Sequence, residues 1–320
     1  QYDELDKYPV MPPHAFARIV RDKQTLNIIY QIIEPPLTKK EQEQRDEIMD
    51  IFIRSLTANI EEIDSNPEAY VRTAMDKVIK SYSMKINKKS KSKLFYYLRR
   101  DLIGYGKMDV LMNDVNVEDI SLDGTNVPIF AYHRKFESVE TTCVWETDEE
   151  LESYVIKLAQ RCGKHISVAE PLLDATLMDG SRIVMKLGHE ISTRGSAFCI
   201  RRFKDDPFSP ADIVAFRTMS SLMVAYLWIA FQNEVPMLFV GGTASGKTTT
   251  LNAMCIFIPW QMKIVSIEST REVNIPQPNW VPGLTRQGFG GESDDGVIGE
   301  FELLKACLLY TSDAADDQAS

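Results

Sequence analysis

The sequence has few cysteines, few histidines and no long hydrophobic run. Its five cysteines are scattered and no pair has C-x-x-C spacing, so we predict neither a zinc site nor a disulfide framework, and we expect reduced thiols. The longest apolar run, 222–231, covers ten residues, which is short of the ~20 that cross a bilayer. We therefore expect a buried helix there and no membrane span.

The sequence also has fewer basic than acidic residues. The 36 lysines and arginines are outnumbered by 46 acidic residues, which gives a net charge of -10. Surfaces that bind nucleic acid depend on clustered Lys and Arg, so this balance argues against a nucleic-acid partner. One stretch, 80–100, differs because it carries eight basic residues and no acid. Two interpretations stay open for it: a solvated helical face, or contact with an acidic partner or membrane surface.

The strongest motif lies in the stretch VPMLFVGGTASGKTTT at 235–250. It fits G-x-x-x-x-G-K-[ST], the phosphate-binding loop of P-loop NTPases. Glycines let backbone N–H groups close around phosphates, the lysine reaches the β and γ oxygens, and the threonine hydroxyl can contact Mg²⁺. We therefore predict an ATP and Mg²⁺ site, and expect that a larger side chain at Gly246 would block the approach of the phosphates. The predicted nucleotide-binding residues are Gly241, Gly242, Thr243, Ala244, Ser245, Gly246, Lys247, Thr248 and Thr249.

The residues around this loop predict a strand, a loop and a helix. The apolar run 237–240 is typical of a buried parallel strand, and apolar residues recur at helical spacing from Leu251 to Ile258. A second apolar run at 264–267 follows Pro259. The whole unit has the length of a βαβ crossover, about 30 residues.

The N-terminal half predicts strands and capped helices. A small strand pair is expected at 16–20 and 26–33. Thr38 with Glu41 forms a capping box, and Asn66 before Pro67 indicates the start of a second helix. From Gly104 onward, short strands such as 117–122, 129–132, 181–187 and 197–203 alternate with turn signals and with a helix expected from Asp148 to Gly163.

These residues resemble the type II/IV secretion ATPases, the motors of secretion systems, type IV pili and archaella, and especially the archaeal archaellum and pilus branch. The matching stretches are YQIIEPPL at 30–37, GYG at 104–106, EDISLDG at 118–124, DGSR at 179–182, RRF at 201–203, the loop at 241–250, and 264–272. The resemblance implies an ATP hydrolase that works as a homo-hexamer and couples hydrolysis to domain motion. It also implies a membrane platform protein as partner, and a cytoplasmic location at the inner face of the cell membrane without spanning it.

The resemblance also assigns site residues one by one. Glu268 matches the glutamate of the family's acidic box, which implies that it holds Mg²⁺ through water or orients the attacking water. Ser269 replaces the aspartate that the family has next. Arg182 and Arg201 match arginines that lie over the γ-phosphate, where they stabilise charge in the transition state. Arg202 is the weaker candidate, because strand alternation turns it to the opposite face from Arg201.

The expected fold class is α/β, with N-terminal α+β domains before a RecA-like P-loop NTPase domain. We expect a strand pair and helical region over 1–93, an α+β domain over 94–204, and a linker over 205–210. The ATPase domain would cover 211–308 with a truncated parallel sheet, and 309–320 is predicted to be a non-native tail.

The C-terminal end departs from the family pattern. The strand with the Walker B acid, the catalytic glutamate and the histidine box do not follow residue 308. We therefore expect a truncated motor that binds ATP and hydrolyses it slowly or not at all, unless 297–300 itself serves as the Walker B segment. Two alternative functions stay open, a RecA-like nucleic-acid translocase and a nucleotide-gated scaffold without catalysis.

Overall fold

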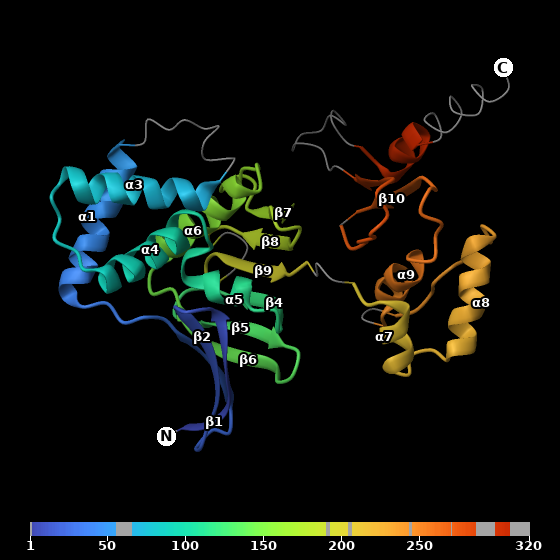
Figure 1. The fold of residues 1–320 in the computed structure, drawn as a ribbon, viewed down its shortest axis with the longest axis horizontal. Helices are drawn as coiled ribbons and strands as arrows, with labels where there is room; N and C mark the ends of the chain where they lie inside the picture. Colours follow the sequence, from blue (N-terminus) through green and yellow to red (C-terminus); the bar gives the residue numbers. More distant parts are fainter. Residues whose placement is uncertain are drawn as a thin grey trace. The chain divides into compact units, whose positions relative to one another are not determined.

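The computed structural model of the chain describes residues 2–55, 66–189, 193–203, 207–242, 245–269, 271–285 and 298–307. Contacts divide the chain into two compact units, shown as a ribbon in Figure 1. The N-terminal unit comprises 1–173 and 183–202, and the P-loop unit comprises 174–182 and 203–320. Across the described ranges, no helix is both long enough and apolar enough to cross a bilayer.

A nine-stranded sheet runs through the N-terminal unit in the order β1-β2-β3-β6-β5-β4-β9-β8-β7. β3 and β6 pair in parallel, whereas β1–β2, β2–β3, β4–β5, β5–β6 and β4–β9 are antiparallel. Together with the helices, this sheet confirms the predicted mixed α/β class. The strands are β1 (Tyr2–Met11), β2 (Ala15–Asp22), β3 (Ile28–Ile33), β4 (Val117–Leu122), β5 (Pro128–His133), β6 (Glu137–Val144), β7 (Leu172–Thr176), β8 (Arg182–Lys186) and β9 (Ala197–Arg201).

The predicted strand pair near the N-terminus is the β2–β3 pair, in which Phe16 lies opposite Ile33. The sequence did not predict β1, because its residues YDELDKYPVM are rich in charge and contain a proline. β1 forms through its pairing with β2, from Tyr2 opposite Asp22 to Met11 opposite Ala15. Half of its residues are exposed and none is fully buried, so its pairing with β2 makes a large contribution to holding it in place.

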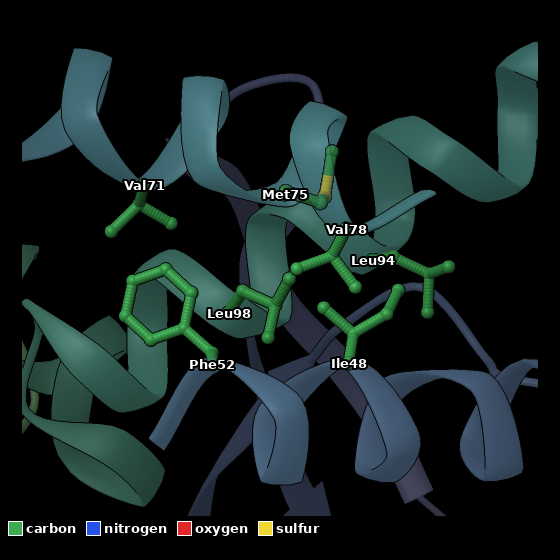
Figure 2. Packing of buried hydrophobic residues seen from close by; sticks show 7 residues of the cluster. All are labelled: Ile48, Phe52, Val71, Met75, Val78, Leu94 and Leu98. Atoms are coloured by element: carbon green, nitrogen blue, oxygen red, sulfur yellow. The ribbon is translucent and has the colours of Figure 1, made fainter. Parts of the chain in front are cut away.

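Three helices form a separate core beside this sheet: α1 (Lys39–Ser55), α3 (Pro67–Ser81) and α4 (Lys88–Leu102). Figure 2 shows how their apolar side chains meet, with Phe52 and Met75 among them. The predicted caps are present. Thr38 Oγ1 accepts the Glu41 N–H at 3.3 Å, and Asn66 accepts the Ala69 N–H at 3.0 Å ahead of Pro67. Capping of this kind stabilises a helix by about 1 kcal/mol.

Aromatic residues connect the helices to the sheet. Tyr96 and Tyr97 of α4 pack with Ala15 of β2 and with Val110 of α5 (Asp109–Asn113), which follows the short turn η1 (Gly106–Met108). On α6 (Asp148–Arg161), Tyr154 packs at a tilt against the buried Trp145, with ring centroids 4.9 Å apart. The sheet thus includes strands from both 1–93 and 94–204, and the predicted boundary at 93/94 falls inside α4.

The P-loop unit contains α7 (Pro210–Ala215), α8 (Ser221–Gln232), α9 (Lys247–Cys255) and a parallel pair of strands, β10 (Ile264–Glu268) and β11 (Trp280–Leu284). One apolar cluster joins α7, α8 and α9 through Ile213, Val224 and Met254. A second joins the end of α9 to Val273 and Ile275, which follow β10. α9 therefore packs on both sides, which fixes the position of the loop that precedes it.

Two predictions about this unit are wrong. Residues 235–240 form no strand, and the side chains of Leu238 and Val240 are 87% and 80% exposed. A strand needs a hydrogen-bonded neighbour, and β10 pairs only with β11 among the described residues. The run 222–231 is helical as expected but is not buried, since Leu222 and Tyr226 are 81% and 72% exposed.

Candidate nucleotide-binding site

The site begins where the loop 241–246 meets α9. Gly246 occupies the position before the helix with φ +83°, in the left-handed region that favours glycine. No side chain among the described residues caps this helix. The N–H groups of its first turn therefore have no capping oxygen as acceptor. Backbone donors at a helix N-terminus, together with the positive end of the helix dipole, favour an anion there.

The backbone conformation gives a second reason for glycine at position 246, and the expectation that a larger side chain would block the phosphates stays a prediction. A Cβ built at Gly246 has no atom of a described, non-adjacent residue within 4 Å, so none of these residues would collide with it. The backbone conformation itself favours glycine, since a left-handed φ costs an ordinary residue roughly 1–2 kcal/mol. Close packing matters at Gly241, where an added Cβ would lie 2.5 Å from Ser245 Oγ.

The lysine of the motif is held by the loop itself. Lys247 Nζ donates to the Gly242 carbonyl at 2.6 Å, and Ser245 Oγ donates to the same oxygen at 2.8 Å. To contact a phosphate, the ammonium group would exchange this carbonyl for phosphate oxygens. The structure thus places the lysine, the serine and the glycine carbonyl together, while the predicted residues Thr243 and Ala244 lie outside the described residues.

Thr248 and Thr249 lie in the first turn of α9, immediately after the lysine. Thr248 is half-buried and Thr249 is exposed. A hydroxyl in the first turn of this helix matches the place that a magnesium-bound threonine takes in a phosphate loop. No group of three or more His, Cys, Asp or Glu side chains in the described ranges could hold a metal ion. Mg²⁺ in nucleotide sites is generally held by one or two protein groups together with the phosphates and waters.

Glu268 ends β10 as the sequence predicts, but its carboxylate has a local structural role. Its Oε1 accepts the N–H groups of Glu272 and Val273 at 3.1 and 2.8 Å. These two bonds shape the turn that follows the strand. Ser269 next to it is exposed, so the residue that replaces the family's aspartate faces solvent.

Each predicted arginine finger forms an ion pair with a neighbouring strand. Arg182 donates two hydrogen bonds to Asp174, at 3.2 and 2.6 Å, and this bonding raises the pKa of the guanidinium. Arg201 donates to Asp119, its cross-strand partner, at 3.1 Å, and its side chain is 71% exposed. Both side chains would have to leave a carboxylate to contact a phosphate, and their catalytic role stays a prediction.

Arg202 behaves as strand alternation predicts. Its side chain points away from the exposed face of Arg201 and donates to the backbone carbonyls of Asp114 and Val117. The contact with Val117 measures 3.1 Å. These bonds join the end of β9 to the start of β4, so Arg202 is a structural residue.

Two residues that the sequence did not single out support the site. Asn252 of α9 donates to the Glu272 carbonyl at 2.9 Å and accepts the Asn274 N–H at 3.2 Å, which fastens the helix to the segment after β10. The guanidinium of Arg271 lies 5.7 Å from the ring centre of Trp280 on β11. A lone Asn on a helix gives no sequence signal, whereas Arg271 lies inside the acidic box. In the alternative Walker B segment 297–300, Ile298 forms an isolated β-bridge and Glu300 begins the helical stretch 300–307, so the described part is not a continuous strand.

Comparison with known proteins bears on this site. Residues 138–287 match the family model of type II/IV secretion system proteins. An uncharacterized protein of Methanocaldococcus jannaschii is 34% identical over 306 residues, which cover 94% of this chain and 54% of that protein. The type IV secretion system protein VirB11 of Bartonella henselae is 27% identical over 184 residues, covering 47% of this chain and 51% of that protein. The chain spans about half the length of these relatives.

A solved structure is also similar. The ATPase DotB of Legionella pneumophila overlaps 56% of this chain and 51% of its own, with 15% identity and a TM-score of 0.35. The sequence matches include the phosphate loop and the segment around Glu268, which both lie within 138–287.

Proposed function

Because the chain belongs to the type II/IV secretion system protein family, we propose that it is an ATP-binding motor ATPase. The observation that carries this proposal is the geometry of Gly246 and Lys247. A left-handed glycine leads directly into a helix whose first turn carries a lysine and two threonines. That arrangement binds the phosphates of a nucleotide through backbone N–H groups and one ammonium group.

ATP with Mg²⁺ is the proposed cofactor. The β and γ phosphates would contact the N-terminus of α9 and the Lys247 ammonium, and Thr248 would offer its hydroxyl to the metal. Glu268 is the proposed carboxylate for Mg²⁺-bound water, and Arg182 and Arg201 are the proposed fingers. In such sites positioning and charge stabilisation supply most of the catalysis of phosphoryl transfer.

The wider proposal is a homo-hexamer that couples ATP hydrolysis to domain motion at a membrane platform protein. A finger supplied by another domain or subunit completes a site only when the pieces meet, and this requirement supports assembly. We infer that the protein is located in the cytoplasm, at the inner face of the cell membrane. We also infer that it drives a secretion system, a type IV pilus or an archaellum. Nucleic acid is not a proposed partner, because the net charge of -10 opposes binding to phosphate backbones.

The test is ATP binding and steady-state hydrolysis for the natural chain and for Lys247→Ala. Loss of the ammonium group should weaken ATP binding at least ~10-fold, since a hydrogen bond to a charged group contributes about 1.5–3 kcal/mol. The matched control is Lys263→Ala, which removes an exposed lysine of the same unit and should leave binding unchanged. Equal binding in all three proteins would refute the phosphate site.

A nucleotide-gated scaffold without turnover is the second candidate. It is favoured by the carboxylate of Glu268, whose Oε1 is already used by two backbone N–H groups. In this case ATP would bind through Lys247 and tighten assembly, and no phosphate would be released above the rate of Lys247→Ala. If phosphate is released and Glu268→Gln stops it without weakening ATP binding, Glu268 is part of the chemistry and the scaffold is excluded.

A further inference from the structure

The N-terminal unit contains a cavity of about 750 Å³ that the proposed ATP site does not use. The turn between β1 and β2 forms one wall, with Pro12 and His14. Helices α3 and α4 form the other walls. A volume in the range of 300–1,000 Å³ is typical of sites that enclose a small molecule.

The cavity has an apolar and aromatic floor. Met75, which is 1% exposed, belongs to the core of the three helices and also lines the cavity. Figure 2 shows Met75 on α3 among the other core side chains. The buried ring of Tyr96 lies 5.3 Å from the ring of His14, and Phe95 lines the same space. This floor offers an aromatic or aliphatic group apolar contacts, and the core fixes the position of the side chains that make them.

The rim of the cavity is positively charged, in contrast to the chain as a whole. Four cationic and two acidic side chains line it, which gives a net charge of +2. Both acids are engaged, since Asp76 pairs with Lys91 at 2.7 Å and Glu68 with Arg99 at 3.5 Å.

Two cations of the rim have no carboxylate partner in the described part of the chain, Arg72 and Lys88. The Arg72 guanidinium lies over the ring of Phe95, 4.2 Å from its centre. Lys88 is exposed in the first turn of α4, which contains no acid. A lysine at the N-terminal end of a helix opposes the helix dipole, so an anion beside it would relieve the repulsion.

We propose that this cavity binds a small organic phosphate, in which a phosphate group is attached to an aromatic or aliphatic moiety. The moiety lies on Met75 and Tyr96, and the phosphate lies between Arg72 and Lys88. Arg provides planar, paired donors for phosphate oxygens, and Lys provides a point charge. The basic stretch 80–100 thereby gains a role as one wall of a ligand site. The inference does not depend on the ATP site.

The test uses 1-naphthyl phosphate as the probe, followed by its own fluorescence or by calorimetry. Lys88→Gln and Arg72→Gln should each weaken binding ~10-fold, because each removes one charge-assisted contact. Lys89→Gln is the matched control, since it removes the same charge from the same exposed turn of α4 but does not line the cavity. It should change the dissociation constant less than ~2-fold.

Two further probes separate the halves of the ligand. Inorganic phosphate and 1-naphthol should each bind at least ~10-fold more weakly than 1-naphthyl phosphate, because each lacks one half. Equal affinity for inorganic phosphate would mean a basic surface only, and equal affinity for 1-naphthol would mean an apolar surface only. Either result would overturn the proposal.

A second set of controls locates the probe. Binding that is lost in Lys247→Ala and kept in Lys88→Gln would place the probe at the phosphate loop and overturn the inference. Sedimentation with phosphatidylglycerol vesicles that is reduced equally by Lys88→Gln and Lys89→Gln, without binding of the naphthyl probe, would mean a flat membrane-binding face. Binding that depends on Lys88 and Arg72 and not on Lys89 or Lys247 supports the cavity.

Discussion

At the residue scale, the conformation of the phosphate loop depends on the backbone of Gly246. Its φ of +83° is costly for any residue with a Cβ, although the space around it is open. We expect Gly246→Ala to lower the free energy of unfolding of the P-loop unit by about 1 kcal/mol and to weaken ATP binding. Urea denaturation and ATP titration measure the two effects.

The neighbouring glycine is the control for this prediction. An added Cβ at Gly242 also meets no atom within 4 Å, and its φ is not in the left-handed region. Gly242→Ala should therefore cause no loss of stability, because alanine at a compatible φ stabilises a protein by about 0.4–1 kcal/mol. Equal losses in the two variants would show that φ is not what selects glycine at 246.

At the scale of elements, a partly buried ion pair fastens α4 to the segment after β3. Arg100 Nη1 donates to both oxygens of Glu34, at 3.0 and 2.8 Å, and the two side chains are only 13% and 21% exposed. Removing one partner of such a pair leaves a charge in a poorly solvated place. We expect Arg100→Ala to lower the free energy of unfolding by about 3 kcal/mol.

The matched comparison is the exposed pair between Arg134 and Glu118. It has a similar length, 2.9 Å, but its side chains are 42% and 47% exposed. Arg134→Ala should cost no more than about 1 kcal/mol, because water screens the charges. Chemical denaturation of both variants tests the difference, and similar losses would mean that burial of the Arg100 pair adds nothing.

A buried hydrogen-bond network joins three strands of the sheet. Tyr8 of β1 and Tyr30 of β3 each donate to Asp114 Oδ2 at 2.6 Å, and His133 of β5 lies 3.0 Å from Tyr8 Oη. The Lys135 N–H donates to His133 Nδ1 at 3.1 Å, so the ring proton is on Nε2. Protonation of His133 would add a hydrogen to Nδ1, where it would face the N–H of Lys135. Burial also lowers the pKa of His133.

This network predicts a loss of stability in mild acid. Because the folded pKa of His133 lies below its ordinary value of 6.5, the unfolded chain binds the proton more readily. The stabilisation is therefore complete above about pH 6.5 and is lost as the pH falls from there towards the folded pKa. Denaturation at pH 7.5 and pH 5.5 should show a larger decrease for the natural chain than for His133→Gln. Equal decreases would exclude His133 as the titrating group.

At the scale of the whole molecule, each unit has its own cores. The three-helix cluster lies in the N-terminal unit, and the clusters around Met254 and Val273 lie in the P-loop unit. We expect two unfolding transitions in a calorimetric scan, and ATP should raise only the one that Gly246→Ala lowers. A single transition that ATP shifts as a whole would contradict this independence.

Local signals in the sequence were sufficient for the helix starts and the phosphate loop. The capping box at Thr38, the Asn66 cap and the loop before Lys247 depend on residues close together in the chain, so spacing predicts them. The family assignment has the same basis, because it depends on short motifs in order. The sequence by itself therefore determined the α/β class and the family, while the nucleotide and the roles of the site residues stay predictions.

Only the tertiary structure decided which segments pair and what each charged side chain contacts. β1 exists because β2 lies beside it, whereas the apolar run at 237–240 pairs with no strand among the described residues. The contacts of Arg182 with Asp174 and of Arg72 with Phe95 join residues whose types alone gave no hint of a partner. The first contact joins the neighbouring strands β7 and β8 and the second joins helices α3 and α4, and the spacing of residues along the chain does not tell which side chains face each other.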